Sequence, residues 1–241
     1  MTSGDRPRPG TYQVVLDHVE RLLTSHELRP GDRLPPEREL AAQLGASRQA
    51  VREAMRVLQT QGVIRSQVGT GDRSGTIVVP APARALGRVL ALHLALESFP
   101  VDDVIEARIL LEGFAAGRAA RRRTAKDLLR IHAELDAMEA DLDPLAFSHA
   151  DVAFHVAVAG TAGNRLVDEL TVAIRESLRG RLLTAMTAPG DWAGLRERLR
   201  REHEGIYSAI SDGRGSRAAD LMEAHVRDFH EDFGSGPDAG S

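Results

Sequence analysis

Apolar residues in the first quarter of the chain recur at helical spacing in three short stretches. In residues 11–26 the valines and leucines fall on one stripe of a helix, which a Pro-Gly-Asp turn then ends. A second helix is expected at about 37–44, closed by Gly45. A third is expected over 47–61, with a serine in the capping position. Helix, short glycine turn and helix form the helix-turn-helix pattern.

Two short β-prone runs follow, at residues 63–67 and 76–79, on either side of a glycine-rich turn. This pattern predicts a β-hairpin, which is the wing of a winged helix-turn-helix. We therefore expect one such domain over residues 11–79, preceded by a disordered, proline-rich segment at 1–10.

The remainder of the chain has helical periodicity throughout and no strand pattern. Residues 80–100 are expected to form a linker and a linker helix, 101–233 an antiparallel bundle of six to seven helices, and 234–241 a disordered tail. The fold class predicted for the whole chain is thus mainly α. The expected helices of this part lie near 83–97, 101–122, 124–140, 144–162, 164–187, 191–212 and 215–233.

Composition narrows the class of protein. The 241 residues include no cysteine, which excludes disulfides and thiolate metal sites. No apolar run approaches the roughly 18 residues of a membrane span, and no signal peptide is recognisable, so a cytoplasmic protein without a membrane partner is expected. The net charge of the whole chain, −4, by itself argues against nucleic-acid binding. However, residues 1–80 carry 11 Arg against 9 acidic residues, a balance of +2, although chance scatter of charge accounts for the same numbers.

Two stretches of the front domain resemble a known family. Residues 34–41, LPPERELA, and 47–54, SRQAVREA, resemble the DNA-binding domain of the GntR family, and the helical second half resembles the FCD ligand-sensing domain of its FadR-type branch. Pro36 departs from the usual serine, which would cap the second helix with Glu39; proline is compatible with a first helical turn, so a slightly weaker start is expected. The usual Thr-Pro is replaced by Gln49-Ala50, at the expected DNA surface.

A recognition helix presents its first residues to base edges in the major groove. Here these are Ser47, Arg48, Gln49, Ala50 and Arg52. An arginine suits guanine and a glutamine suits adenine, so the set is chemically able to read a sequence.

Three further residues complete the predicted DNA surface. Arg38 of the preceding helix is placed to reach a phosphate or a base, and Gly69 and Thr70 lie at the wing tip, where the backbone can approach the minor groove. The family resemblance implies operator contacts by Arg38, Arg48, Arg52 and Gly69. The alternative is that these arginines form an ordinary solvated helix face.

A candidate metal site lies in the second half. Asp151 and His155 are four residues apart on a largely apolar helix, so both are expected to point inward, where unpaired charge is costly and metal ligation would justify it. His203 and His225 each lie on the inward stripe of another helix. Taken singly, each would more often be structural. The FCD resemblance implies that these four residues together hold a divalent ion, for which Zn²⁺, Ni²⁺ or Mn²⁺ is suitable.

Three other features have competing interpretations. Arg108 lies on a core-facing helix and either binds the carboxylate of a ligand or forms an ion pair with Glu112, four residues on. Asn164 is expected to cap a helix, and ligand contact is the alternative. The run at 121–123, three arginines, is expected to be a solvated helix end that complements the helix dipole, rather than a nucleic-acid patch.

Together these features predict a regulator rather than an enzyme. A homodimer would bind a palindromic operator in double-stranded DNA, as a repressor released or re-oriented by a small organic acid bound near the metal. A direct metal sensor, a metal-dependent hydrolase and an architectural DNA binder are the alternatives. No general base or nucleophile accompanies the cluster at a recognisable spacing, which disfavours the hydrolase.

Overall fold

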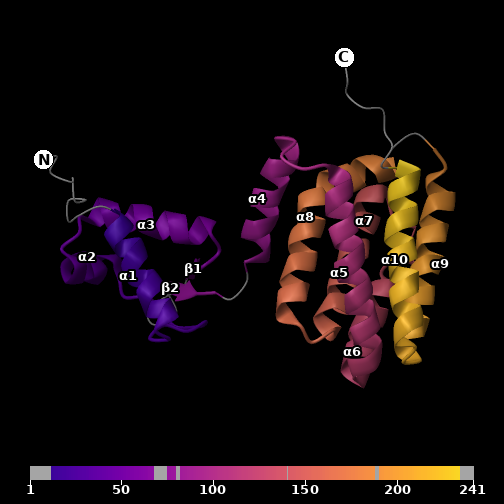
Figure 1. Cartoon of the computed structure of the whole chain (residues 1–241), viewed down its shortest axis with the longest axis horizontal. Coiled ribbons are helices and arrows are strands. Elements are labelled where there is room, and N and C mark those ends of the chain that lie inside the picture. The colour runs from indigo at the N-terminus through magenta and orange to yellow at the C-terminus, as the bar shows by residue number, and fades with distance from the viewer. Residues whose placement is uncertain (1–11, 68–74, 80–81, 140, 188–189, 234–241) are drawn as a thin grey trace, which may run out of the picture. The chain divides into compact units, whose positions relative to one another are not determined.

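The computed structural model describes residues 12–67, 75–79, 82–139, 141–187 and 190–233. The chain divides into two compact units, Met1–Ala85 and Leu86–Ser241 (Figure 1).

The first unit has three helices and a two-stranded antiparallel sheet. The helices are α1 (Tyr12–Thr24), α2 (Glu37–Leu44) and α3 (Arg48–Thr60), and the strands are β1 (Ile64–Gln67) and β2 (Gly75–Val78). The strands pair from Ile64 opposite Val78 to Gln67 opposite Gly75. Their core is aliphatic, built from the predicted stripes of the three helices and from the first strand: Val15, Val19, Leu40, Val51, Ala54, Leu58 and Ile64. This is the predicted winged helix-turn-helix.

The turn between α2 and α3 is built by local chemistry. Gly45 has φ of 61°, in the left-handed region, and its N–H bonds to the carbonyl of Ala41. Ser47 Oγ then accepts a 3.1 Å hydrogen bond from the N–H of Ala50 and caps α3. Pro36 occupies the N-cap of α2 without any side-chain hydrogen bond, which agrees with the expected weaker helix start.

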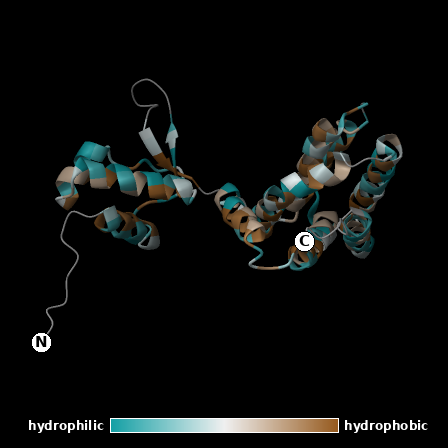
Figure 2. Ribbon diagram, turned by 90° about the horizontal axis from the view of Figure 1, so that it is seen from above, coloured by the Kyte–Doolittle hydropathy of each residue, from teal (hydrophilic) through white to brown (hydrophobic). Residues whose placement is uncertain are grey.

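The second unit is a helical bundle. Its elements are α4 (Ala83–Ala95, which begins in the first unit), α5 (Val101–Arg122), α6 (Ala125–Asp136), α7 (Pro144–Thr161), α8 (Arg165–Thr187), α9 (Trp192–Ser211) and α10 (Gly215–Phe233). Single helices carry both a hydrophobic and a hydrophilic side in Figure 2. The mainly α class with a small wing is confirmed. The helix expected over 124–140 ends earlier, because the N–H of Met138 turns back to the carbonyl of Leu135.

Small residues let helix α10 lie close to α5. A Cβ atom added at Gly113 would be 2.6 Å from the Glu223 side chain, and one added at Gly117 would be 3.2 Å from the carbonyl oxygen of Gly215. Alanines 115, 116, 119 and 120 of α5 are almost completely buried. Close packing of these helices places the polar residues of α5 deep in the bundle.

The arginine run at the end of α5 is only partly a solvated helix end. Arg121 and Arg122 are exposed, but Arg123 donates from Nε to the carbonyl of Ser211 at 2.9 Å and so caps the end of α9. Arg118 does the same for α7, through the carbonyl of Ala162 at 3.1 Å. The prediction was therefore wrong for Arg123, because its partner lies on a helix distant in sequence. Asn164 accepts hydrogen bonds from the N–H groups of Leu166 and Val167, as predicted for a cap.

Candidate metal centre and DNA-binding helix

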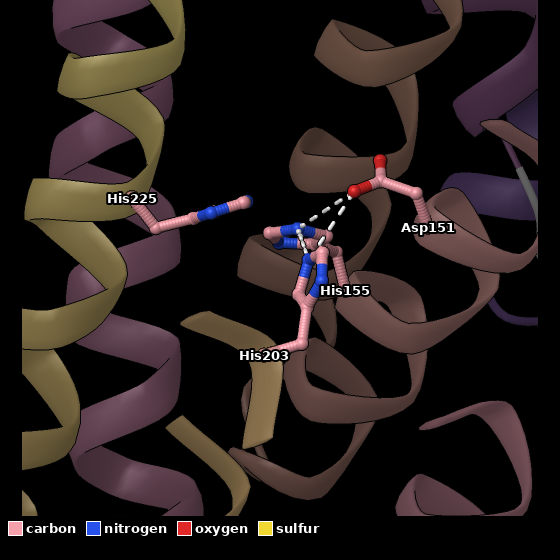
Figure 3. A group of neighbouring side chains, drawn as sticks. All are labelled: Asp151, His155, His203 and His225. Carbon is pink, nitrogen blue, oxygen red and sulfur yellow. Dashed lines mark hydrogen bonds and ion pairs between the residues drawn. The ribbon is translucent and has the colours of Figure 1, made fainter. Parts of the chain in front are cut away.

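Four buried side chains from three helices converge in the second unit. Asp151 and His155 come from α7, His203 from α9 and His225 from α10, and one ligand atom of each lies within 4.8 Å of all the others. The Nε2 atoms of His155 and His203 are 3.2 Å apart. Asp151 Oδ1 is 3.2 Å from His203 Nε2 and 3.6 Å from His155 Nε2. Figure 3 shows Asp151, His155 and His203 in mutual contact, with His225 directed toward them from α10.

Each of the four residues lies on the buried face of its helix, among apolar residues. In α7, Asp151 and His155 share a face with buried residues such as Ala150, Phe154 and Val158. In α9 the stripe is Leu199, His203, Ile206 and Ile210, and in α10 it is Met222, His225, Val226 and Phe229. The ring of Phe154 packs edge-on against His203, with a centroid separation of 4.8 Å. The structure thus brings together the four residues predicted from the sequence.

Burial favours the neutral, metal-binding form of two of the imidazoles. It lowers the pKa of His203, and it lowers the pKa of His225 well below the ordinary value, with further lowering by His203 and His155. For Asp151, burial acts to raise the pKa, but the Arg175 guanidinium and the facing imidazoles outweigh it and hold the pKa well below its usual range. The site therefore presents an ionised Asp151 carboxylate and neutral His203 and His225 imidazoles, which are the protonation states of metal ligands.

Two carboxylates lie close to the Nδ1 atoms of His225 and His155. Glu202 Oε2 is 2.7 Å from His225 Nδ1, which leaves Nε2 of that ring for the centre. Glu112 Oε2 is 2.5 Å from His155 Nδ1, although the two groups are not aligned as a hydrogen bond. His203 Nδ1 is buried with no hydrogen-bond partner among the described residues. Carboxylate, imidazole and metal in line is a common arrangement in metalloproteins.

Sequence reasoning missed Arg175 of α8, which is completely buried. Its Nη1 lies 3.1 and 3.2 Å from the two oxygens of Glu112, and its Nη2 donates to Asp151 Oδ2. Thr171, Ile174 and Leu178 of the same helix are buried too, at the spacing of an inward stripe. An arginine within such a stripe was the available signal.

The structure shows the internal ion pair predicted as one interpretation of Arg108, and ligand binding stays a prediction. Its Nε pairs with Glu112 Oε1 at 2.7 Å, so the internal ion pair exists. It also lines a cavity of about 10 Å³, roughly the space of one water molecule, which two of the four candidate ligands line as well. The rest of the cavity is lined by Asp151, Leu182, Met186, Leu199, His225 and Phe229.

The predicted DNA-reading residues mostly lie on the surface of the first unit. Arg38, Ser47, Arg48, Gln49 and Arg52 are exposed. Arg52 Nε is 3.2 Å from Glu37 Oε2, and this pair ties the start of α2 to α3.

Two parts of the predicted DNA surface have a different outcome. Ala50 is only 7% exposed and faces inward from α3, so placing it among the base-facing side chains was wrong. The capping turn at Ser47 rotates this position toward the core. Gly69 and Thr70 lie outside the described residues.

Within the described ranges, no helix combines the length and apolarity required to cross a membrane.

Comparison with known proteins identifies both units. The family described as bacterial regulatory proteins, gntR family, matches residues 11–73, and the FCD domain matches residues 103–228. The HTH-type transcriptional regulator LutR of Bacillus subtilis is 32% identical over 217 residues, which cover 87% of this chain and 95% of that protein. The putative L-lactate dehydrogenase operon regulatory protein of Escherichia coli is 30% identical over 224 residues, 90% of this chain and 83% of that protein.

The solved structure of Streptococcus agalactiae GntR matches with a TM-score of 0.62 at 25% identity, covering 91% of this chain and 99% of that chain. The families and relatives matched are transcriptional regulators rather than enzymes. With a winged helix-turn-helix in front and an FCD domain behind, the chain belongs to the GntR family of bacterial transcriptional regulators.

Proposed function

We propose that this regulator is a homodimeric repressor that binds a palindromic operator and is released by a small carboxylate bound beside a divalent metal. The observation that carries the proposal is the convergence of one carboxylate and three imidazoles next to Arg108, in the domain that does not contain the DNA-binding helix.

The residues present fit a divalent ion such as Zn²⁺, Ni²⁺ or Mn²⁺. Two imidazole nitrogens that are each about 2.1 Å from a shared ion lie about 3.0–3.4 Å from each other. The Nε2 atoms of His155 and His203 are 3.2 Å apart, within that range. Asp151 Oδ1, His155, His203 and His225 would hold the ion, which would act as a Lewis acid for an anionic ligand.

The charge balance of the buried groups favours an anionic effector. Arg108 and Arg175 contribute two positive charges, and Glu112 and Asp151 contribute two negative charges, so these four groups sum to zero. A divalent ion adds two positive charges in a place where unpaired charge is costly. A carboxylate beside the metal would offset part of that charge.

Arg108 is the side chain best placed to select a carboxylate. Its Nε is held by Glu112, and a guanidinium presents a planar fork of donors that matches a carboxylate. One relative is named for an L-lactate dehydrogenase operon, so 2-hydroxy carboxylates of that size are the first compounds to test.

Operator recognition would use Arg38, Ser47, Arg48, Gln49 and Arg52, with Gly69 and Thr70 of the wing approaching the minor groove. The exposed positions of the first five support this assignment. Coupling between the two domains would run through residues 80–82 and α4. In the second unit Gly87 of α4 lies against α8, where an added Cβ would be 2.9 Å from the carbonyl oxygen of Ala173. Ala173 is two residues from Arg175, so a shift of α8 would reach α4.

The test uses an operator selected from a random DNA pool with the native protein. Elemental analysis of the purified protein identifies the metal, and operator affinity is measured at fixed salt with and without L-lactate and related carboxylates. Affinity that falls at least 10-fold with one carboxylate supports the proposal. A ligand with equal affinity for both states cannot shift the equilibrium, so unchanged affinity with every carboxylate removes the effector assignment.

A second candidate is a direct metal sensor. The observation that favours it is the same charge balance, because the ion alone changes the buried charge by two units. Operator affinity that follows free metal concentration, with carboxylates inert, would establish this candidate instead.

A further inference from the structure

We propose that the exposed face of α5 pairs with the same face of a second copy of this chain, antiparallel about a two-fold axis level with residue 112. This inference rests on the homodimer of the proposed function and assigns the surface that forms it.

Two large apolar side chains are exposed side by side on α5. Leu110 is 70% exposed and Phe114 is 45% exposed, on a helix whose opposite face carries the buried Arg108 and Glu112. Residues four apart on a helix are neighbours. The Phe114 ring is also held in place, because the Arg118 guanidinium carbon lies 5.5 Å from its centroid and Arg118 Nε bonds the Ala162 carbonyl. A fixed aromatic beside a leucine is typical of an interface core.

An acidic and a basic residue lie at the two ends of this apolar pair. Asp103 and Arg121 are both exposed. At about 100° per residue, Asp103, Leu110, Phe114 and Arg121 fall within about 40° of one another around the helix. They form a single stripe, which we call the α5 stripe.

The order of residues in the α5 stripe selects the antiparallel arrangement. The successive spacings are seven, four and seven residues, which read the same in both directions. When two copies pair antiparallel about residue 112, Leu110 of each faces Phe114 of the other, and Asp103 of each faces Arg121 of the other. A parallel arrangement would place aspartate beside aspartate and arginine beside arginine. A two-fold interface requires this kind of self-complementarity.

The two kinds of contact have different roles. The Leu110 and Phe114 contacts, made twice, would supply the apolar core of the helix pair. The exposed charge pairs add little affinity, but they set orientation, because like charges in juxtaposition oppose the wrong arrangement.

A second exposed apolar face consists of Leu86, Val89 and Leu92 of α4 and of Leu96, which directly follows the helix. It begins at the boundary between the two units, and its apolar side chains alone do not indicate which partner would cover it. It therefore serves as the alternative surface in the test.

The first experiment measures the mass of the full chain by light scattering over a range of concentrations. We expect a dimer for the native chain, and an at least 10-fold weaker dimer for Asp103→Arg and for Arg121→Asp. The double variant D103R/R121D restores opposite charges across the two-fold axis and should recover native association. Leu129→Ser on α6, equally exposed at 71%, is the matched control for a change at an apolar surface residue and should remain dimeric.

The second experiment uses the absence of native cysteine. An equimolar mixture of Leu110→Cys and Phe114→Cys chains should form a disulfide-linked dimer on mild oxidation, while either variant alone should not, because only the mixture places two thiols opposite each other. Efficient linkage of Leu110→Cys alone would overturn the antiparallel assignment.

The outcomes separate this inference from the proposed function. A native chain that is monomeric at every concentration contradicts both the homodimer and the α5 stripe. A dimer that survives Leu110→Asp but is lost in Leu92→Asp, with helicity unchanged in both, retains the homodimer and overturns the α5 stripe in favour of α4.

Discussion

Arg175 donates from Nη2 to Oδ2 of Asp151, so that Oδ1 is the oxygen of this carboxylate that faces His203 and His155. The same guanidinium contacts both oxygens of Glu112 through Nη1. One buried cation therefore orients a candidate metal ligand and forms ion pairs with two carboxylates.

Arg175→Met should destabilise the metal-free protein by about 3–5 kcal/mol, because the buried Asp151 carboxylate loses its arginine partner, whereas Glu112 keeps Arg108. Arg175→Lys, which keeps the charge, should lose less. Arg130→Gln is the control: Arg130 also binds α7, but only through a carbonyl and a hydroxyl, and its loss should cost about 1 kcal/mol. Urea unfolding in the presence of a chelator measures all three. Native-like stability of Arg175→Met would show that the two carboxylates do not depend on it.

Glu202→Gln should weaken metal binding about 10- to 100-fold, because His225 loses the carboxylate behind its Nδ1. Glu204→Gln is a matched control, since Glu204 lies two residues along α9 and pairs with Arg200 instead. Competition with a chromogenic chelator gives both affinities. Equal affinities for the two variants would remove Glu202 from the site.

The stability of the metal-free protein should fall as pH is lowered from about 7 to 5. Burial lowers the pKa of His203 and His225 below their ordinary 6.5, so the unfolded chain takes up protons below pH 6.5 that the folded chain does not. The free energy of unfolding then decreases by up to about 1.4 kcal/mol per pH unit for each imidazole. The pKa values of Asp151 and Glu112 are lowered as well, so their protonation reduces the free energy of unfolding only below about pH 4.5.

Urea unfolding at pH 7.5, 6.5 and 5.5 checks this dependence. His225→Gln should give a flatter profile, because it removes the imidazole with the more strongly lowered pKa. An identical slope in native and variant protein would argue against a buried neutral His225.

Arg48→Ala should weaken specific operator binding about 10- to 100-fold while leaving the fold intact. Arg48 is exposed at the first position of α3, and a bidentate arginine–guanine pair is worth about 1–3 kcal/mol of base discrimination. Arg21→Ala on α1 is the control within the same unit, since Arg21 is exposed and pairs with Glu27. Fluorescence anisotropy with the selected operator, at constant salt, measures both. Unchanged specific affinity for Arg48→Ala would refute its role.

Arg108→Met should remove the response to a carboxylate without changing operator affinity in its absence. A hydrogen bond to a charged group contributes about 1.5–3 kcal/mol, so we expect carboxylate affinity to fall about 10- to 100-fold by calorimetry. Metal content should remain native, because the metal ligands are unchanged. A normal carboxylate affinity would restrict Arg108 to its ion pair with Glu112.

Periodicity and capping chemistry were sufficient to predict the secondary structure. The glycine at 45 and the serine at 47 are local signals, and they predicted the helix-turn-helix that the structure contains. The four-residue spacing of Asp151 and His155 likewise placed them on one face of α7. These signals act within a few residues, so they can be recognised without knowledge of the remaining chain.

Only the tertiary structure showed which side chains meet across helices. It paired Arg175 with Asp151 and Glu112, placed Glu202 behind His225, directed Arg123 to the end of α9 and turned Ala50 into the core. The physical reason is that helical spacing determines which face of a helix is buried, whereas the neighbour that this face contacts depends on how helices far apart in sequence pack together.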